Sequence, residues 1–268
     1  MQKIKNIMAA LPEPEELDFS ALAGALQDGS VELACVLGPT ASGKTRYAVA
    51  LARRLSGLTG RRAEIISADS RQVYRGMDIG TGKDLAEYAD IPYHLIDIAG
   101  PGDGYNVYRF RQDFMKAFGD IRARGAIPIL CGGTGLYINA ATSAYDFRQS
   151  KPLSSPSEMP DAAPKTFFIG TLVSREVRNA RIDARLDARL QEGMVDEIRG
   201  LLESGVPPEV LLSYGLEYKY VTLYLKGELD FGTMRELLAT AIHQFAKRQM
   251  TWFRGMERSG IRIHWVEN

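Results

Sequence analysis

Short, continuous apolar runs alternate along this chain with segments that have the three-to-four-residue spacing of amphipathic helices. The runs typical of buried strands are residues 31–38, 63–69, 93–98, 126–133, 167–173 and 261–266. Helical spacing covers residues 44–55, 107–123, about 174–202 (with Ser174 as a cap) and about 233–257. Because strands alternate with helices, the pattern predicts an α/β fold, a P-loop NTPase-like parallel sheet with helices on both faces.

Two segments lie outside this alternation. Residues 1–30 contain two prolines and an acidic cluster, and predict an N-terminal extension with one helix. Residues 148–165 are rich in proline and serine, which is typical of an exposed loop. The remaining chain, residues 31–268, is expected to form one catalytic domain.

Composition narrows the class of protein. The 268 residues include 33 basic and 33 acidic side chains, so zero net charge excludes a generally polycationic nucleic-acid binder but allows a local basic face. Cys35 and Cys131 lie within predicted strands and are expected to be reduced core thiols. No stretch approaches the ~20 apolar residues of a membrane span, and the N-terminus lacks an apolar signal core. We expect a cytoplasmic monomer with no membrane contact.

An eight-residue motif follows the first predicted strand and opens the first predicted helix. It fits G-x-x-x-x-G-K-[ST] at every defined position: Gly38, Pro39, Thr40, Ala41, Ser42, Gly43, Lys44 and Thr45. In such a P-loop, glycines let successive backbone N–H groups turn inward, and the helix N-terminus adds positive potential. Lys44 supplies a charge and Thr45 a hydroxyl ligand for Mg²⁺. The motif predicts a diphosphate or triphosphate site rather than a chance glycine turn.

The P-loop does not specify a reaction. P-loop hydrolases also place an acidic residue at the end of a neighbouring apolar strand, yet the run 126–133 ends in glycines. Asp69, at the end of the run 63–69, is the other candidate. Its carboxylate could support Mg²⁺, act as a general base or cap a helix, and spacing alone leaves these roles open. A phosphoryl-transfer kinase is compatible with this pattern.

Five motifs occur in the order found in a known enzyme family. They are GPTASGKT, DSRQVYRGMDIGTGK, HLIDI, PILCGGTGLY and AKRQMTWFR, spread over most of residues 31–266. With this set, the chain resembles the tRNA dimethylallyltransferase (isopentenyltransferase) family. The resemblance implies that the P-loop holds dimethylallyl diphosphate with Mg²⁺ at Thr45. It also implies that the acceptor is N6 of adenosine 37 in the tRNA anticodon loop.

The same resemblance assigns roles to individual residues. Asp69 would take the proton from N6 as this nitrogen attacks the allylic carbon, and Arg181 would help Lys44 and Thr45 hold the leaving diphosphate. Further residues would lie against the target nucleotide beside Asp69: Ser70, Arg71, Gln72 and Thr134. These roles suit the reaction. An exocyclic adenine amine is a poor nucleophile and needs a base such as Asp69, and the negative charge of the leaving diphosphate must be neutralised.

Two basic segments could contact RNA phosphates. One helical stripe contains Arg178, Arg181, Arg185 and Arg189. The alternative interpretation is a solvated face on which Asp183 and Asp187 pair with these arginines. The last helix is expected to bury Leu237, Leu238, Ala241, Ile242, Phe245 and Trp252, and its Lys247, Arg248, Arg254 and Arg258 could extend an RNA-facing patch. His243 is expected to be structural rather than a metal ligand.

The chain also departs from the family it resembles. The tRNA-modifying members carry a helical insertion that embraces the anticodon arm, whereas only residues 138–166 fill this place here, and they are expected to form a short loop. The usual glycine-tyrosine-arginine segment occurs in altered form, as Gly215-Leu216-Glu217-Tyr218-Lys219. Two alternatives to tRNA prenylation therefore stay open. They are an adenylate isopentenyltransferase acting on free AMP, ADP or ATP, and a P-loop kinase.

Overall fold

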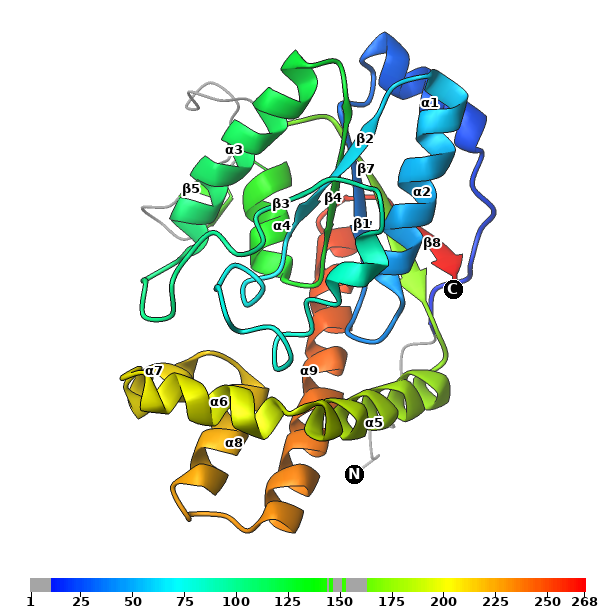
Figure 1. Ribbon diagram of the computed structural model, residues 1–268. Coiled ribbons are helices and arrows are strands. Elements are labelled where there is room, and N and C mark those ends of the chain that lie inside the picture. Colours follow the sequence, from blue (N-terminus) through cyan, green and yellow to red (C-terminus); the bar gives the residue numbers. More distant parts are fainter. Residues whose placement is uncertain (1–10, 144, 147–150, 153–162) are drawn as a thin grey trace.

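The computed structural model describes residues 11–143, 145–146, 151–152 and 163–268. In these residues a six-stranded sheet has the order β3-β2-β4-β1-β7-β8, and every neighbouring pair is parallel (Figure 1). The strands are β1 Leu33–Leu37, β2 Ala63–Ser67, β3 Tyr93–His94, β4 Ile127–Gly132, β7 Thr166–Leu172 and β8 Ile263–Glu267. The predicted parallel sheet is confirmed.

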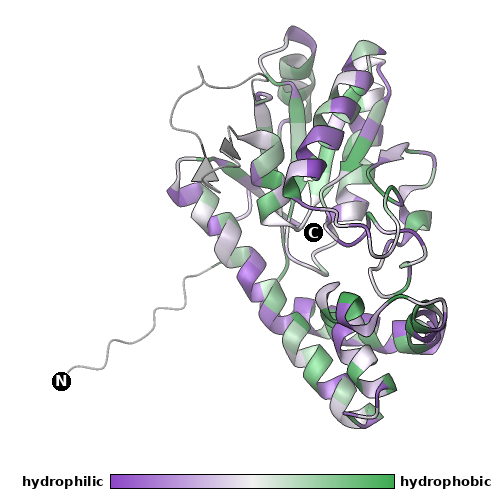
Figure 2. Cartoon of the chain, turned by 90° about the vertical axis from the view of Figure 1, so that its left-hand side faces the viewer, coloured by the Kyte–Doolittle hydropathy of each residue, from purple (hydrophilic) through white to green (hydrophobic). Residues whose placement is uncertain are grey.

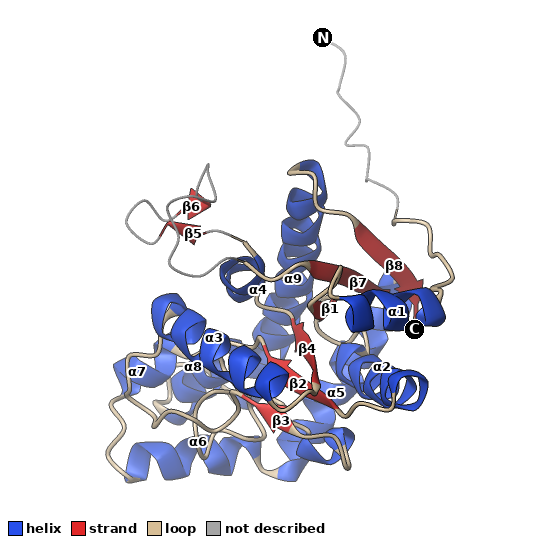
Figure 3. Cartoon of the chain, turned by 90° about the horizontal axis from the view of Figure 1, so that it is seen from above, coloured by secondary structure: helices blue, strands red, loops and turns tan. Residues whose placement is uncertain are grey.

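Helices cover both faces of the sheet (Figure 3). The helices of the described residues are α1 Phe19–Asp28, α2 Lys44–Thr59, α3 Val107–Ala123, α4 Gly135–Thr142, α5 Arg175–Glu192, α6 Met194–Glu203, α7 Pro208–Ser213, α8 Leu216–Leu225 and α9 Phe231–Arg258, with a short 3-10 helix at Leu85–Tyr88. Successive β1 residues feed two cores, since Ala34 and Val36 pack with α1 and α2, whereas Leu33, Cys35 and Leu37 pack with α3 and α9. This alternation is the period of a strand buried on both faces.

Helix starts follow local capping chemistry. The side chains of Asp18, Asn106, Ser174 and Asp230 each accept a hydrogen bond from a backbone N–H in the first turn of α1, α3, α5 and α9. The predicted cap at Ser174 is therefore confirmed, and the described part of the segment 1–30, residues 11–30, contains the helix α1. In Figure 2 the strands are hydrophobic, and α9 carries both hydrophobic and hydrophilic segments.

A helical layer lies beyond the carboxyl ends of the strands (Figure 1). We use this term for α5, α6, α7, α8 and the adjoining half of α9, where α8 packs against both α7 and α9. The predicted helix over 174–202 is wrong at its centre. Gly193 has a φ of 106° and separates α5 from α6, because this left-handed backbone ends a helix and is rarely adopted by other residues.

Other expectations are also corrected. The strand at 93–98 is only the two residues of β3, because Leu95 and Asp97 have positive φ of 63° and 58°. The expected loop at 138–166 begins as the end of α4 and contains an antiparallel pair, β5 Tyr145–Asp146 with β6 Lys151–Pro152. Most of the expected loop at 148–165 lies outside the described residues.

Of the six α9 residues expected in the core, three are exposed and Ala241 is half-buried. Leu237, Phe245 and Trp252 are 42%, 38% and 42% exposed, whereas Leu238 and Ile242 are buried as expected. None of the described helices is long and apolar enough to cross a membrane.

The two cysteines behave as expected. Cys35 and Cys131 are free and buried. Burial raises the pKa of both thiols, that of Cys131 to about 12. Both therefore stay protonated near neutral pH.

Candidate active site

The P-loop has the strand–loop–helix context that its sequence predicted. It leaves β1 at Leu37 and enters α2 at Lys44, and Gly43 caps this helix with a φ of 78°. No side chain caps α2, so its first N–H groups remain available to an anion. Burial lowers the pKa of Lys44, and the charges of Cys131 and Asp69 oppose this shift.

Side chains from distant elements hold the P-loop in place. The Gln249 side chain on α9 accepts a hydrogen bond from Thr40 N (2.8 Å) and donates one to Gly133 O (2.9 Å). Asn268 Nδ2 donates to Ser42 O at 2.7 Å, and Ser42 Oγ lies 2.7 Å from Thr171 Oγ1. Sequence reasoning missed Gln249 and Asn268, because no local pattern marks a contact between segments more than 200 residues apart.

A cavity of about 910 Å³ lies between the P-loop and the helical layer. The residues predicted for the site that line it are Thr40, Ala41, Gly43, Lys44, Thr45, Asp69, Ser70, Arg71, Gln72, Thr134 and Arg181. The other three P-loop residues, Gly38, Pro39 and Ser42, are buried and do not line it. The structure therefore brings together residues that lie far apart in the sequence.

Asp69 follows β2 and lies at the cavity wall. Its Oδ1 accepts hydrogen bonds from the backbone N–H groups of Arg71 (2.8 Å) and Gln72 (3.4 Å), which fix the carboxylate in a tight turn. Its Oδ2 accepts no hydrogen bond from the described residues and can take up a proton. This arrangement suits a base that must be held still while one oxygen stays reactive.

Residues next to Asp69 are tied to other segments. Thr134 Oγ1 accepts a hydrogen bond from Ser70 N at 3.2 Å, so the turn after β4 and the turn after β2 are linked. Gln72 uses both ends of its amide within the protein, since Oε1 accepts from Ser67 Oγ (3.2 Å) and Nε2 donates to Gly82 O (3.1 Å). These contacts make Gln72 a brace for the site.

The arginine stripe of α5 faces inward. Arg181, Arg185 and Arg189 line the cavity, whereas Arg178 is buried and does not. Arg185 donates a hydrogen bond to Gly82 O (3.3 Å) and forms an ion pair with Asp84 (2.6 Å). Arg189 forms a longer ion pair with Asp84, at 3.6 Å.

The alternative interpretation paired these arginines with Asp183 and Asp187, and this pairing is wrong because both carboxylates are engaged elsewhere. Asp183 lies 2.9 Å from His243, and Asp187 pairs with Arg235 at 2.7 Å. His243 is thus structural, as expected.

Glu217 also lines this wall and was not predicted as a site residue. Burial raises its pKa, and the positive charges of Arg189 and Arg185 oppose the shift.

A carboxylate from the helical layer anchors the loop 76–83. Glu197 Oε2 accepts hydrogen bonds from the N–H groups of Asp78 and Ile79, both at 2.7 Å. Its Oε1 accepts from Gly80 N (3.0 Å) and Tyr218 Oη (2.7 Å). Four donors around one carboxylate form a strong, charge-assisted contact between the two parts of the molecule.

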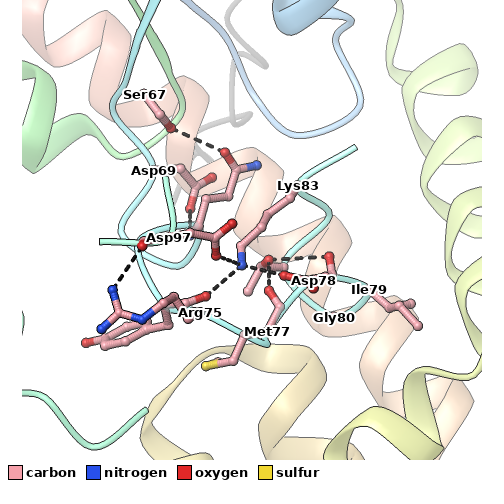
Figure 4. Close-up of polar contacts among 12 residues, drawn as sticks. Ser67, Asp69, Arg75, Met77, Asp78, Ile79, Gly80, Lys83 and Asp97 are labelled. Carbon is pink, nitrogen blue, oxygen red and sulfur yellow. Dashed lines mark hydrogen bonds and ion pairs between the residues drawn. The ribbon is translucent and has the colours of Figure 1, made fainter. Parts of the chain in front are cut away.

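The same loop is held from its other side by Lys83, which is buried (Figure 4). Its ammonium group donates to Tyr74 O at 2.6 Å and to Asp78 Oδ1 at 2.5 Å, and it also pairs with Asp97. These contacts fix the backbone that presents Gly82 O to Gln72 and Arg185.

The residues present fit a Mg²⁺ ion that enters with a diphosphate. Thr45 and Asp69 line one cavity with Lys44. No group of three or more acidic, histidine or cysteine side chains suited to a metal occurs among the described residues. Mg²⁺ requires no such group, because it is commonly held by one or two protein oxygens together with substrate phosphates and water.

The chain is similar to proteins of one known enzyme family. A family model described as IPP transferase matches residues 72–162 and 147–256. A protein of Parabacteroides distasonis named tRNA dimethylallyltransferase 1 is 47% identical over 291 positions, covering 89% of this chain and 93% of that protein. One of Porphyromonas gingivalis with the same name is 47% identical over 285 positions, covering 87% and 92%.

The alignment lengths show a deletion in this chain. A 291-position alignment that covers 89% of 268 residues leaves about 50 positions at which the relative has residues and this chain has none. The two segments matched by the family model overlap at residues 147–162. That these positions belong to the family's helical insertion, at residues 138–166 of this chain, stays a prediction.

Two solved structures share the fold over most of their length. A tRNA isopentenylpyrophosphate transferase of Bacillus halodurans has a TM-score of 0.73 at 30% identity, covering 88% of this chain and 89% of that one. A tRNA delta(2)-isopentenylpyrophosphate transferase of Staphylococcus epidermidis has a TM-score of 0.73 at 29% identity, covering 88% and 92%. With its P-loop, its cavity and these relatives, the chain belongs to the IPP transferase family, which includes the tRNA dimethylallyltransferases.

Proposed function

We propose that this enzyme transfers a dimethylallyl group from dimethylallyl diphosphate to N6 of adenosine 37, next to the anticodon of tRNA. One observation carries the proposal: the P-loop residues Lys44 and Thr45 line the same cavity as the carboxylate of Asp69. A volume of about 910 Å³ accommodates a prenyl diphosphate and a nucleotide together.

The reaction is a displacement at the allylic carbon. N6 of the adenine attacks C1 of the dimethylallyl group, the C1–O bond breaks, and diphosphate leaves with the bonding electrons. Asp69 accepts the proton that N6 loses, through the oxygen that accepts no hydrogen bond from the described residues. Lys44 and Arg181 stabilise the charge that develops on the leaving diphosphate. A Mg²⁺ ion bound at Thr45 would neutralise part of the same charge.

The turns after β2 and β4 hold the acceptor. We assign Ser70, Arg71 and Thr134 to the nucleotide, because they line the cavity beside Asp69. Gln72 keeps this wall in place through Ser67 and Gly82. Orientation of N6 towards C1 converts a slow bimolecular step into a reaction between positioned groups.

The relatives' names support tRNA as the acceptor, because the two curated relatives and both solved structures are named as enzymes that act on tRNA. A free adenine nucleotide is the second candidate, because about 50 positions of the relatives are absent here. Cytoplasmic location and a monomeric state remain predictions.

Labelled dimethylallyl diphosphate offered with unmodified tRNA, AMP or ATP tests the proposal. Label should enter tRNA and spare AMP and ATP, and Lys44→Ala should abolish this transfer as a control for contaminating activity. Label in AMP without label in tRNA would favour the second candidate. Phosphate released from ATP without any allylic donor would instead favour a kinase or hydrolase.

A further inference from the structure

One peptide unit of the P-loop lies at the boundary between the protein interior and the cavity. It joins Ser42, which is fully buried and does not line the cavity, to Gly43, which does. A trans peptide unit is planar, so its C=O and its N–H point in opposite directions. The direction of the Ser42 carbonyl therefore sets the direction of the Gly43 N–H.

The Ser42 carbonyl is held by the side chain of Asn268, the residue that follows β8. Asn268 Nδ2 donates to Ser42 O at 2.7 Å, and no other donor in the described part of the chain reaches this oxygen. The helix α2 cannot supply one, because its first accepting carbonyl is that of Gly43, which bonds Tyr47 N at 3.0 Å. A buried carbonyl needs a partner, and Asn268 provides it.

Asn268 is itself fixed in place. Its backbone N–H donates to Leu172 O at 3.1 Å, which continues the parallel pairing of β7 with β8. Its side-chain amide packs against the P-loop backbone, because a Cβ added to Gly43 would lie 2.1 Å from Nδ2. The end of the last strand is therefore a rigid support for the Ser42–Gly43 peptide unit.

We propose that Asn268 is a positioning residue, which holds the Ser42 carbonyl and so directs the Gly43 N–H at the diphosphate of dimethylallyl diphosphate. This inference rests on the proposed function, which puts that diphosphate in the P-loop. The Gly43 N–H lines the cavity side of the unit and donates no hydrogen bond to the described residues, so it is available to an anion.

The glycine at position 43 explains why a side chain is required. Gly43 has a φ of 78°, and glycine adopts positive and negative φ about equally readily. The residue alone therefore does not fix the orientation of the preceding peptide unit. If that unit turned over, its N–H would leave the site, and a carbonyl oxygen, which repels phosphate, would take its place.

Asn268→Ala and Asn268→Asp test the proposal, because both remove the donor and Asp also keeps the shape. The Kd for inorganic diphosphate with Mg²⁺, measured by calorimetry, should rise about tenfold in Asn268→Ala. It should rise further in Asn268→Asp, which adds a negative charge beside the P-loop. KM for dimethylallyl diphosphate should rise in parallel, and KM for tRNA should change less than about twofold. Glu267→Gln, at the exposed neighbouring position, is the control and should bind like wild type.

The amide NMR signal of Gly43 separates orientation from a general loss of structure. In the wild-type protein this signal should move downfield when diphosphate is added, because the N–H then donates to an anion. In Asn268→Ala with saturating diphosphate the movement should be much smaller, while the amide signals of Cys35 and Val36 in β1 stay in place.

Three results would overturn the proposal. They are wild-type affinity in both Asn268 variants, a Gly43 signal that moves fully in Asn268→Ala, and a Gly43 signal that does not move in the wild-type protein. Diphosphate binding depends on the P-loop and not on the acceptor. Normal binding without transfer to tRNA would therefore overturn the proposed acceptor alone, and the comparison of the Asn268 variants would still decide this inference.

Discussion

Glu197→Gln removes the charge that joins the helical layer to the loop 76–83 while it keeps the shape of the side chain. Glu197 accepts three backbone hydrogen bonds and one from Tyr218. The amide has only one oxygen, so its NH₂ group must face at least one backbone N–H. The least costly arrangement puts the NH₂ group in place of Oε1, where Tyr218 can turn its hydroxyl and accept a hydrogen bond from it. The N–H of Gly80 is then left without an acceptor.

The magnitude follows from these contacts. A hydrogen bond to a charged group contributes about 1.5–3 kcal/mol and a neutral one about 0.5–1.5 kcal/mol. Two hydrogen bonds become weaker and a third is lost. After partial relaxation of the loop, the net destabilisation should be about 2–4 kcal/mol. The free energy of local opening of the loop therefore falls, and this change is larger than the change in the free energy of global unfolding.

Native-state hydrogen exchange measures this effect directly. The amides of Asp78, Ile79 and Gly80 should exchange at least ~30-fold faster in the variant, as 2 kcal/mol requires. The turnover rate should fall about tenfold, since the loop presents Gly82 O to Gln72 and Arg185. Binding of dimethylallyl diphosphate should be unchanged. Glu203→Gln, an exposed position of the same helix, is the control. Wild-type exchange rates at these three amides would refute the reasoning.

Two other changes test the P-loop brace and the far end of the sheet. Gln249→Leu removes the hydrogen bonds from α9 to Thr40 and Gly133. The Kd for dimethylallyl diphosphate, measured by calorimetry, should therefore rise about tenfold. An unchanged Kd would show that the P-loop keeps its shape without Gln249. Glu64 is paired with Arg124 and His94, and its side chain is 7% exposed. The hydrogen bond from Arg124 lowers the pKa of Glu64 to about 2, although burial opposes this. The carboxylate therefore stabilises the fold above its unfolded pKa of about 4.5, and this contribution is lost as the pH falls towards 2. Because Arg124 is half exposed, we expect Glu64→Gln to cost about 1–3 kcal/mol at pH 7 and clearly less at pH 3 in urea titrations. A cost that is the same at both pH values would contradict this.

The parts of the fold that could be predicted are those with local causes. Continuous apolar runs identified the central strands β1, β2 and β4 because each is buried throughout its length. The P-loop motif carried its own strand–loop–helix context. Parallel topology then placed Asp69 and Thr134 at the same edge of the sheet as Lys44, as expected for residues that follow parallel strands.

The rest depends on tertiary contacts that no local pattern encodes. Residues 174–202 were predicted as a single long helix because α5 and α6 have compatible apolar spacing, and only the backbone of Gly193 separates them. Trp252 has core-like spacing on α9, yet it faces a cavity whose opposite wall comes from residues far away in sequence. Glu197 and Gln249 look like ordinary helix-surface residues until their partners are known.

Asp69→Asn tests the central claim most directly, since the amide keeps the shape of the side chain and cannot accept a proton. Single-turnover transfer to tRNA should fall by about 10²- to 10⁴-fold, the range for loss of a general base. The Kd for dimethylallyl diphosphate should stay within about twofold of wild type, because the P-loop is unchanged. Transfer at close to the wild-type rate would contradict the account, since the proton of N6 would then leave by another route.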